Sequence, residues 1–280
     1  MRMTTSGLLK AVLLITAVFC FAGVSVFAQR EERNREDRGL SCDDNWGDRD
    51  GRRSHCEMKE QTIAATGSRI SVDGRQNGGV SVRGWERNEI FVRARIQTWA
   101  PTESEAESIA RQIQIQTAGA QIRAEGPSNE RDRNWSVSFE VFVPRQSDLS
   151  LKAHNGGISV ATVRGRIEFE TVNGGVSLRE VGGDVKGETT NGGLSIKLAG
   201  NRWDGEGLDV RTTNGGVNLS VPENYSAHLE TSTVNGGLNI GFPVTLQGKI
   251  ERELSVDLGS GGSPLRVRTT NGGISIKRGA

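Results

Sequence analysis

The sequence predicts an all-β protein, a β-solenoid of Asn-Gly-Gly repeats with one short helix near residues 102–115. Apolar and polar residues alternate through most of the chain after residue 60, which is typical of strands with one buried face. Glycine accounts for 37 of the 280 residues and recurs at fixed offsets beside these segments, which indicates ordered turns. The tripeptide Asn-Gly-Gly begins at Asn77, Asn155, Asn173, Asn191, Asn214, Asn235 and Asn271.

Residues 1–28 have the three parts of a signal peptide. Arg2 and Lys10 make the start positive, residues 11–26 are almost unbroken apolar sequence, and residues 26–28 place small side chains at both positions that signal peptidase reads. Cys20 does not fit a lipoprotein cysteine, because a bulky residue precedes it. We expect cleavage after Ala28, export to the periplasm or cell surface, and no further membrane span. An uncleaved anchor is the alternative, because the run approaches the ~18 residues that begin to span a bilayer.

Residues 29–59 are predicted to be a charged spacer followed by a disulfide-closed loop. Segment 29–41 interleaves basic and acidic residues with almost nothing apolar, so it cannot bury enough surface to order itself. Cys42 and Cys56 are the cysteines left in an exported chain and are expected to form a disulfide. The acidic run around Asp48 resembles part of a calcium loop, but Trp46 stands where EF-hand spacing needs an acidic residue. A solvated surface loop is therefore favoured, with calcium left open.

The β-repeat domain is predicted to span residues 60–280. Segments 70–72, 80–82, 90–92, 121–124 and 135–143 read as short strands separated by Gly, Asn and Pro. For the helix, Thr102 can cap the first turn together with Glu105 three residues later. Apolar residues at helical spacing then share one face, namely Ala106, Ile109, Ala110 and Ile113.

The repeat is more detailed than the tripeptide alone. From Asn155 onward the asparagines are separated by 18, 18, 23, 21 and 36 residues. An apolar–Ser/Asn–apolar segment follows each glycine pair, as in Leu194-Ser195-Ile196. Each unit therefore reads as strand, Asn-Gly-Gly turn, strand and second turn. Fixed positions before the asparagines hold Thr171, Thr189, Thr212, Thr233 and Thr269 two residues earlier, and Leu149, Ile167, Val185, Leu208, Leu229 and Leu265 six residues earlier.

Two architectures fit this unit. Asn-Gly between alternating segments is the usual signal for a tight hairpin, which would give an antiparallel meander. A β-solenoid would instead use about 18 residues for one coil of two strands and two turns, with longer intervals as inserted loops, the largest over 241–264. We favour the solenoid because parallel in-register stacking places like side chains on like, whereas a meander has no need for threonine at one fixed position.

The Asn-Gly-Gly turn has a structural explanation and a functional one. A turn that passes through left-handed φ suits Asn and Gly, and stacked Asn amides can hydrogen-bond from coil to coil. A turn ladder of Asn155, Asn173, Asn191, Asn214, Asn235 and Asn271 is therefore expected. A ligand-binding row of asparagines is the alternative, although the structural explanation is sufficient.

These features resemble a known family. The strand over 135–143, Pro144, the strand over 149–151 and the serial Thr-x-Asn-Gly-Gly-apolar-Ser-apolar units are similar to a bacterial family of adhesin-like proteins, counted among domains of unknown function with β-strand repeats. The resemblance covers roughly residues 60–278. It implies a β-solenoid-like fold and an envelope or extracellular location. It supplies no catalytic residues, and the Cys42–Cys56 loop lies outside it.

The sequence contains no recognisable catalytic, cofactor-binding or metal-binding constellation. His55, His154 and His228 lack zinc-ligand spacing, and no Gly-x-Ser-x-Gly elbow or phosphate-binding loop is present. Without the signal the chain has 33 basic and 34 acidic residues, which gives no electrostatic footprint for nucleic acid. Glycan-cleaving enzymes need clustered carboxylates, and the candidates are scattered beside turn glycines: Asp184, Glu188, Asp204, Glu206 and Asp209.

The predicted function is therefore a non-catalytic envelope or surface module for adhesion or scaffolding. Its expected partners are a cell-surface glycan or another envelope protein. A glycan-active enzyme of the solenoid type is the runner-up, which a cleft that gathers carboxylates would favour. A periplasmic regulatory or sensor partner is a third reading that the sequence does not separate from the first.

Overall fold

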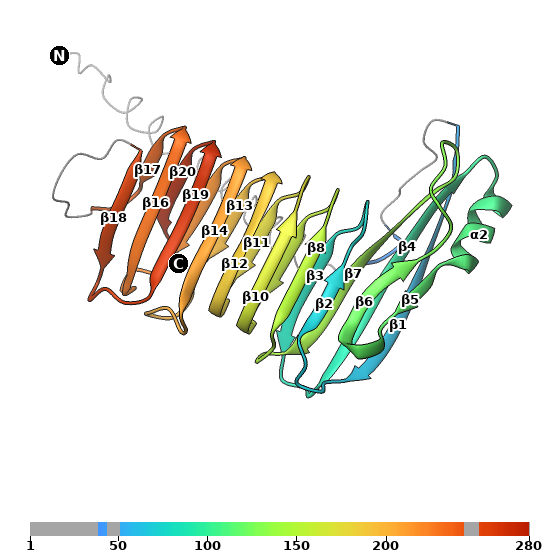
Figure 1. The fold of residues 1–280 in the computed structure, drawn as a ribbon, viewed down its shortest axis with the longest axis horizontal. Coiled ribbons are helices and arrows are strands. Elements are labelled where there is room, and N and C mark those ends of the chain that lie inside the picture. Colours follow the sequence, from blue (N-terminus) through green and yellow to red (C-terminus); the bar gives the residue numbers. More distant parts are fainter. Residues whose placement is uncertain (1–38, 44–50, 244–251, 280) are drawn as a thin grey trace, which may run out of the picture. The chain divides into compact units, whose positions relative to one another are not determined.

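Two ten-stranded sheets face each other and enclose one apolar core (Figure 1). The computed structural model describes residues 39–43, 51–243 and 252–279, so the predicted signal peptide and most of the predicted spacer lie outside the described residues. The prediction of mostly β-structure with one short helix is confirmed: the helix is α2 (Glu103–Gln112), and a short 3₁₀ turn, η1 (Ala118–Ala120), follows it.

The first sheet, here called sheet 1, contains the second strand of each repeat unit. Its neighbouring strands, in order, are β1 (Arg53–Ala64), β4 (Glu89–Ala100), β7 (Asn134–Pro144), β3 (Val80–Trp85), β9 (Ile158–Ala161), β11 (Val176–Arg179), β13 (Leu194–Lys197), β15 (Val217–Val221), β20 (Ile274–Arg278) and β17 (Leu238–Ile240).

The other sheet, here called sheet 2, contains the first strand of each unit. Its order is β18 (Glu253–Leu258), β16 (Ala227–Asn235), β19 (Pro264–Asn271), β14 (Gly207–Asn214), β12 (Gly182–Asn191), β10 (Arg164–Thr171), β8 (Leu149–Ala153), β2 (Ile70–Asp73), β6 (Gln121–Glu125) and β5 (Gln114–Gln116).

The repeats form solenoid-like coils rather than hairpins. The strands on either side of Asn191, β12 and β13, lie in different sheets, so they do not pair with each other. Instead β12 pairs in parallel with β10 and β14, and β13 pairs in parallel with β11 and β15. Equivalent residues are in register, as Asn191 and Asn214 are. The turn therefore carries the chain from one sheet to the other.

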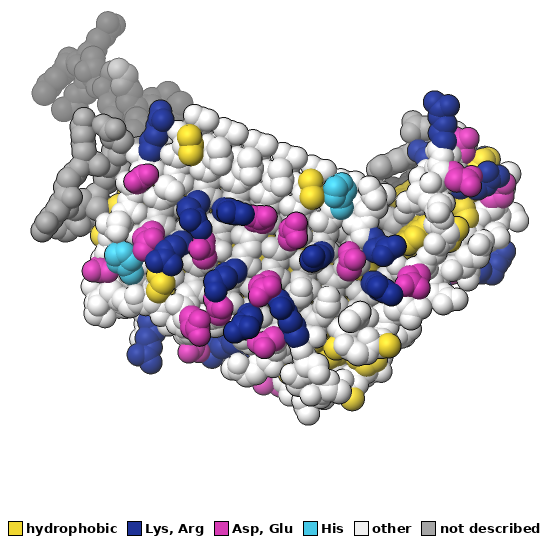
Figure 2. Space-filling view, in the orientation of Figure 1, with side chains coloured by type: hydrophobic (Ala, Val, Ile, Leu, Met, Phe, Trp, Pro, Cys, Tyr) yellow, Lys and Arg dark blue, Asp and Glu magenta, His cyan; other side chains and the backbone are white. Residues whose placement is uncertain are grey.

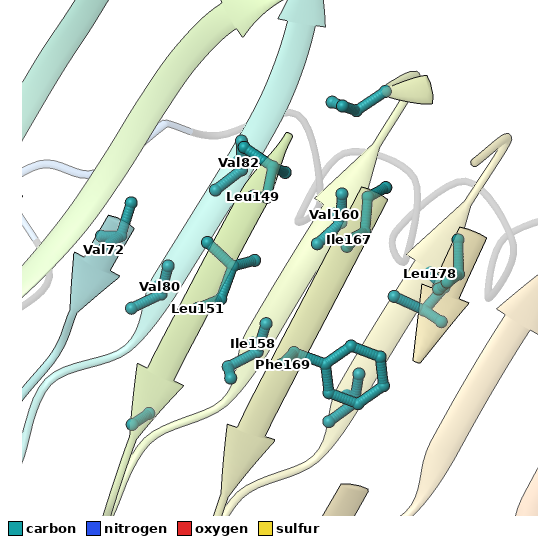
Figure 3. Close-up of a cluster of buried hydrophobic side chains, with 14 of the residues drawn as sticks. Val72, Val80, Val82, Leu149, Leu151, Ile158, Val160, Ile167, Phe169 and Leu178 are labelled. Atoms are coloured by element: carbon teal, nitrogen blue, oxygen red, sulfur yellow. The ribbon is translucent and has the colours of Figure 1, made fainter. Parts of the chain in front are cut away.

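Inward-facing aliphatic side chains fill the space between the sheets (Figure 3). The alternation along each strand places one residue in the core and the next outside it. In Figure 3 side chains of sheet 2 lie beside side chains of sheet 1 in pairs, namely Leu149 with Val82, Leu151 with Val80, and Ile167 with Val160. All six of these side chains are buried, and this burial is the main favourable term that holds the coils together.

Threonine at its fixed position has an interior role. The Thr189 side chain is buried, and its hydroxyl donates a hydrogen bond of 2.7 Å to the carbonyl oxygen of Gly174 in the neighbouring coil. A buried hydroxyl needs such a partner, because leaving it unpaired costs free energy. The same bond to the first glycine of a neighbouring turn recurs at Thr171, Thr212, Thr233 and Thr269.

The expected reason for glycine in these turns is wrong. None of the Asn-Gly-Gly residues after Asn155 has a φ in the left-handed range. Glycine is required by the close approach of neighbouring coils, since a Cβ at Gly174 would overlap the carbonyl oxygen of Gly156. A Cβ at Gly192 would overlap the Gly174 oxygen in the same way. The first glycine of the turn thus leaves room for the carbonyl that accepts the threonine hydroxyl.

The coils do not follow one another in sequence order at the C-terminal end. The last coil, β19 and β20, lies between the coil of β14–β15 and the coil of β16–β17. The expectation that residues 241–264 are only an inserted loop is therefore wrong. This segment contains β18, which pairs antiparallel with β16, and it brings the chain back into the gap.

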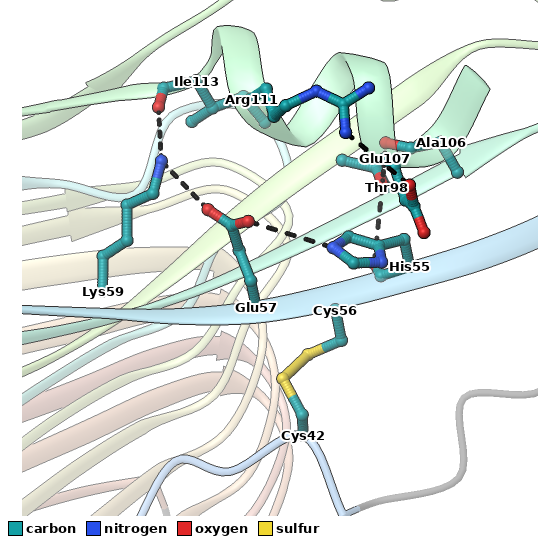
Figure 4. Close-up of polar contacts among 10 residues, drawn as sticks. All are labelled: Cys42, His55, Cys56, Glu57, Lys59, Thr98, Ala106, Glu107, Arg111 and Ile113. Atoms are coloured by element: carbon teal, nitrogen blue, oxygen red, sulfur yellow. Dashed lines mark hydrogen bonds and ion pairs between the residues drawn. A yellow bond between two sulfur atoms is a disulfide. The ribbon is translucent and has the colours of Figure 1, made fainter. Parts of the chain in front are cut away.

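The N-terminal end departs from the repeat. β1 begins at Arg53, inside the segment 29–59 that the sequence places before the β domain, and it pairs antiparallel with β4 along its whole length. α2 packs on these two strands (Figure 4). The Thr98 hydroxyl of β4 donates to the Ala106 carbonyl, at 2.8 Å, and Lys59 of β1 donates to the Ile113 carbonyl, at 2.9 Å. As predicted, Thr102 caps this helix by accepting the Glu105 N–H.

Candidate functional site: the outer faces of the coils

The outer face of sheet 1 carries a straight row of small polar side chains. These residues stand between two buried apolar neighbours, as Ser195 does between Leu194 and Ile196, so they point away from the core. Strand register places them side by side, at roughly 4.8 Å from strand to strand. Five are serines and two are asparagines, and we call them the hydroxyl row after the serines: Ser81, Ser159, Ser177, Ser195, Asn218, Ser275 and Asn239.

A second outward row runs parallel to the hydroxyl row, two residues further along each strand. Four of its positions are cationic, which makes this edge of the face positive. We call it the basic row, and its members in strand order are Arg83, Ala161, Arg179, Lys197, Ser220 and Lys277.

Aromatic side chains continue the basic row toward the N-terminal end of sheet 1. Phe142 of β7 pairs with Arg83, and Phe91 of β4 pairs with Phe142. Trp85, two residues after Arg83, lies 5.4 Å from the Phe142 ring and 6.3 Å from the Phe91 ring, centroid to centroid. Arg87 stands 4.9 Å above the Trp85 ring. All three rings are partly exposed, so the cluster is an outward platform rather than core.

A shallow groove of about 650 Å³ runs over the hydroxyl row. Glycines and serines line its floor, including Gly157, Gly175 and Gly193, and their short side chains leave the surface open above them. Leu40 lies at one end, where the neighbouring Ser41 carbonyl accepts a hydrogen bond of 3.2 Å from Arg95. The groove therefore exposes hydroxyl groups and backbone along several coils.

The outer face of sheet 2 has a different chemistry (Figure 2). Lys and Arg side chains are interspersed with Asp and Glu over this face. One row alternates in sign across consecutive strands: Glu168, Lys186, Asp209, Arg266 and Glu230. A shallow depression of about 500 Å³ lies over these strands.

Charges on the sheet 2 face neutralise one another. Arg266 Nε donates to Glu230 Oε2 at 2.8 Å, and this bond, together with the positive charge, lowers the pKa of the Glu230 carboxyl. Arg268 pairs with Asp209, and Lys186 pairs with Asp184 at 3.0 Å. Mutually paired surface ions contribute little stability individually, and they leave little charge for a ligand.

Of the carboxylates that the sequence offered for glycan cleavage, only Glu188 and Asp209 line the depression over sheet 2, and basic side chains stand among them. Asp184 and Glu188 lie on β12 and Asp209 lies on β14, and each is paired with a basic side chain. Asp204 pairs with Arg164 at 3.1 Å in a turn, and Glu206 is an exposed turn residue. A general acid needs a raised pKa, which a neighbouring cation opposes.

One arrangement of potential chemistry was missed by the sequence reasoning. On the sheet 2 face, His228 Nδ1 lies 2.7 Å from Asp257 Oδ1, and Nε2 lies 3.2 Å from Ser255 Oγ. The order resembles a serine-hydrolase triad. However, Nε2 is also 3.6 Å from Glu230, and Ser255 is exposed on an open strand, where water surrounds any developing charge. The group therefore reads as a surface cluster that ties β18 to β16.

A signal for this cluster was present in the sequence. Leu254, Val256 and Leu258 alternate with Ser255 and Asp257 inside the segment interpreted as a loop. That alternation marks a strand with its polar residues outward.

The remaining candidate residues have structural contacts. Cys42 and Cys56 form a disulfide with an S–S distance of 1.98 Å, which fixes residue 42 to the outer side of β1 (Figure 4). His55, the preceding residue of β1, lies 3.9 Å from Glu57, and His154 is exposed in a turn. Within the described ranges, no group of three or more His, Cys, Asp and Glu side chains could hold a metal ion.

The turn asparagines form a hydrogen-bonded ladder. Asn191 Nδ2 donates to Asn173 Oδ1 at 2.8 Å, and Asn191 Oδ1 accepts from Asn214 Nδ2 at 2.8 Å. The same bond links Asn173 to Asn155, Asn155 to Asn77, Asn271 to Asn214, and Asn235 to Asn271. Each amide is thus used in joining coils.

Among the described residues, no helix is both long enough and apolar enough to cross a membrane.

Comparison with solved structures finds distant likenesses. One is titled "putative cell adhesion protein" from Clostridium sporogenes, with 13% identity, a TM-score of 0.45, and coverage of 80% of this chain and 100% of that chain. A second is a "putative adhesin" from Bacteroides fragilis, with 10% identity, a TM-score of 0.34, and coverage of 80% and 97%. A third is a "Putative lipid binding protein" from Parabacteroides distasonis, with 11% identity, a TM-score of 0.30, and coverage of 80% and 97%.

No curated protein matches this sequence. The family model described as Toastrack DUF4097 matches residues 58–277, which is most of the chain and includes every coil. The chain therefore belongs to the Toastrack DUF4097 family, whose fold is a solenoid-like β-repeat.

Proposed function

We propose that this protein is an exported, non-catalytic envelope or surface module that adheres to, or scaffolds, an extended partner through a repetitive β face. The observation that carries the proposal is the in-register hydroxyl row on sheet 1, from Ser81 to Asn239. It repeats a small polar side chain, Ser or Asn, at strand spacing over several coils. Such a surface suits a partner that is itself long and repetitive.

The chemistry of the two faces supports binding over turnover. The candidate carboxylates of sheet 2 are paired with arginine and lysine, and the Ser255–His228–Asp257 group lies open to water. Glycan hydrolysis needs two carboxyl groups that flank one bond, with one of them held protonated. A glycan-active enzyme is therefore the weaker proposal.

Export is supported by two independent features. The first is the tripartite segment over residues 1–28, with its positive start and apolar run. The second is the Cys42–Cys56 disulfide, because such bonds persist in oxidising compartments. We propose that the mature chain begins at Gln29.

The proposal is tested with the full chain, exported from a bacterial host that carries its own envelope. Intact mass should correspond to residues 29–280, and protease treatment of whole cells or of spheroplasts should distinguish a surface location from a periplasmic one. The purified protein should then be retained on isolated envelope material without releasing soluble sugar from it. A mass that keeps the apolar run, a lack of retention, or steady release of sugar would each contradict a part of this proposal.

A further inference from the structure

The two outer faces of the coils differ in charge. Each carboxylate of the sheet 2 row is balanced by a neighbouring cation. The hydroxyl and basic rows of sheet 1 contain no acidic side chain, and Glu140 of β7, which continues the hydroxyl row beyond Ser81, is itself paired with Arg93 at 2.8 Å. We infer that the outer face of sheet 1 binds a linear anionic polysaccharide along the hydroxyl row, with the acid groups of the polymer toward the basic row. This inference rests on the proposed function and names its ligand class and its face.

The basic row has charge available for a ligand. Among the residues that the structure describes, Arg83, Lys197 and Lys277 have no ion-pair partner. On sheet 2, by contrast, Arg211 is paired with Glu188 and Arg266 with Glu230. A cation without a partner keeps its full attraction for an incoming anion, screened only by salt.

The cations are also separated by whole numbers of strand spacings. Lys197 is one strand from Arg179 and two strands from Lys277, so the steps along the row are roughly 5 and 10 Å at strand spacing. A polymer with an acid group on successive sugar units presents charge with a similar period. In-register coils therefore match a repeating polyanion better than they match a single small anion.

The groove lies over the hydroxyl row and the turn glycines that precede it, and its chemistry suits a sugar chain. Its floor is made of turn glycines and of the hydroxyl row, with Ser159, Ser177 and Ser195 among its lining residues. Hydroxyl groups both donate and accept hydrogen bonds, as sugar hydroxyls do. The basic row lies on the other side of the hydroxyl row, two residues further along each strand, so a chain lying over the hydroxyl row can contact both rows at once.

The aromatic cluster extends the same surface. Phe91 and Phe142 continue the basic row beyond Arg83, and Trp85 lies against Phe142. A partly exposed aromatic ring offers a flat apolar surface against which the C–H face of a sugar ring can stack. Cations, hydroxyls and aromatic rings thus occur together on the outer face of sheet 1, with Phe142 and Phe91 aligned with the basic row.

Two other occupants of this face are disfavoured by the same residues. A second copy of the chain, packed face to face, would bring its own basic row against this one, and like charges repel. A lipid bilayer favours apolar side chains that insert among the acyl chains. The outward coil positions of sheet 1 offer only Ala161 as an apolar side chain, and the aromatic rings lie at one end.

The test uses polygalacturonate as the anionic polymer and its fully methyl-esterified form as the neutral match. Binding to the exported full chain is measured by isothermal titration calorimetry at low and at physiological salt. We expect binding to the acid form that weakens as salt rises, and at least about tenfold weaker binding to the ester. Equal affinity for the two polymers would overturn the inference.

Variants locate the binding face. The double variant Lys197→Gln/Lys277→Gln should weaken binding about tenfold. Ser177→Asp puts a negative charge on the groove floor, so it should also weaken binding about tenfold, and it should leave the melting temperature unchanged. The matched control is Lys186→Gln with Arg211→Gln on sheet 2, which removes the same net charge and should change affinity less than about twofold. Equal loss in the control would mean non-specific charge attraction and would overturn the inference.

The remaining outcomes separate this inference from the proposed function. If envelope retention persists in the Lys197→Gln/Lys277→Gln variant, the module binds by another face, and only the inference fails. If the unmodified chain is not retained on envelope material, the proposed function fails, whether or not the chain binds polygalacturonate. Binding to anionic lipid vesicles, together with no binding to polygalacturonate, would assign the face to a membrane surface and would also overturn the inference.

Discussion

The ring of Phe169 fills the space that a side chain at Gly187 would need. The two residues are direct neighbours across β10 and β12, and both face the core. A Cβ at Gly187 would lie 2.5 Å from Cγ of the Phe169 ring and 2.5 Å from the Phe169 carbonyl oxygen. One coil thus contributes a large side chain at this position and the next contributes none.

Gly187→Ala should therefore lower the free energy of unfolding by about 1–3 kcal/mol through overpacking. Gly237→Ala is the matched control, because nothing lies within 4 Å of a Cβ at Gly237, and it should have little effect. Chemical denaturation measures both. Adding Phe169→Leu to Gly187→Ala should recover part of the loss. If the two substitutions were instead strictly additive, the proposed contact would be wrong.

The two glycines of one turn should respond differently to alanine. At Gly174 a Cβ would overlap the Gly156 carbonyl oxygen, whereas at Gly175 it would lie 3.6 Å from the Gly193 oxygen, an ordinary contact. Gly174→Ala should thus cost about 2–4 kcal/mol, because backbone must move, and Gly175→Ala should cost under about 1 kcal/mol. Equal melting temperatures for the two variants would rule out close coil approach as the reason for glycine.

The inside and outside of a coil can be compared at adjacent positions. Ile196 is buried between β11 and β15, and Ser195 points outward. Ile196→Asp should cost several kcal/mol, since it buries an unpaired carboxylate. Ser195→Asp should cost well under 1 kcal/mol. Asn191→Ala, which removes two amide hydrogen bonds of the ladder, should fall between them at about 1–2 kcal/mol. Thermal melts give the order, and a Ser195→Asp variant as damaged as Ile196→Asp would reverse the assignment.

Tyr225 gives a pH prediction with its own optical signal, because it is the only tyrosine of the chain. Burial raises the pKa of its hydroxyl to about 12 from 10.0, since the interior disfavours the phenolate. The folded state therefore holds this proton more tightly than the unfolded state does. The resulting stability is fully present below pH 10 and is lost as the pH rises from 10 to about 12. Absorbance titration of the native protein should show a midpoint near 12; a midpoint near 10 would mean that Tyr225 is solvated.

The disulfide should act locally. Cys42 and Cys56 are separated by 14 residues, and closing such a loop restricts the unfolded chain by about 3 kcal/mol in the entropy model. Because Cys42 lies beside β1 and the coils lie further along sheet 1, the Cys42→Ser/Cys56→Ser pair should expose β1 and its neighbours to hydrogen exchange while β12 and β13 keep their protection. Uniform loss of protection would show that the disulfide holds the whole domain.

Sequence patterns predicted the coils because both their signals are local. The alternation around Ser195 gives the inward and outward faces, and threonine at a fixed offset gives the stacking. The role of the first turn glycine was not predictable, because it depends on the distance to a carbonyl in another coil. For Gly174 that carbonyl belongs to Gly156, and backbone approach leaves no trace in residue type beyond the glycine itself.

The order of the last coils was also hidden, for a physical reason. Every coil presents the same Thr-x-Asn-Gly-Gly edge, so β14 can pair as well with β16 as with β19 on pattern alone. What decides is β18, whose antiparallel pairing with β16 turns the chain back. On the outer faces, the residue types of each row were visible, but the alignment of Arg83 with Phe142 depends on β7 pairing with β3 across a long sequence separation.

The late insertion of β19 and β20 has a consequence for how the protein is made. A chain that emerges from its N-terminus presents β14 and β15 with an open edge while residues 264–278 are still missing. The next strand to appear, β16, carries the same edge pattern and can occupy that place, which only the final residues fill in the finished molecule. At this end the order in which the strands are synthesised thus differs from their order in the sheets. The last strands to be made, β19 and β20, complete the fold by filling an internal position. A stop codon shortly before Pro264 would leave a chain free to settle in a different register.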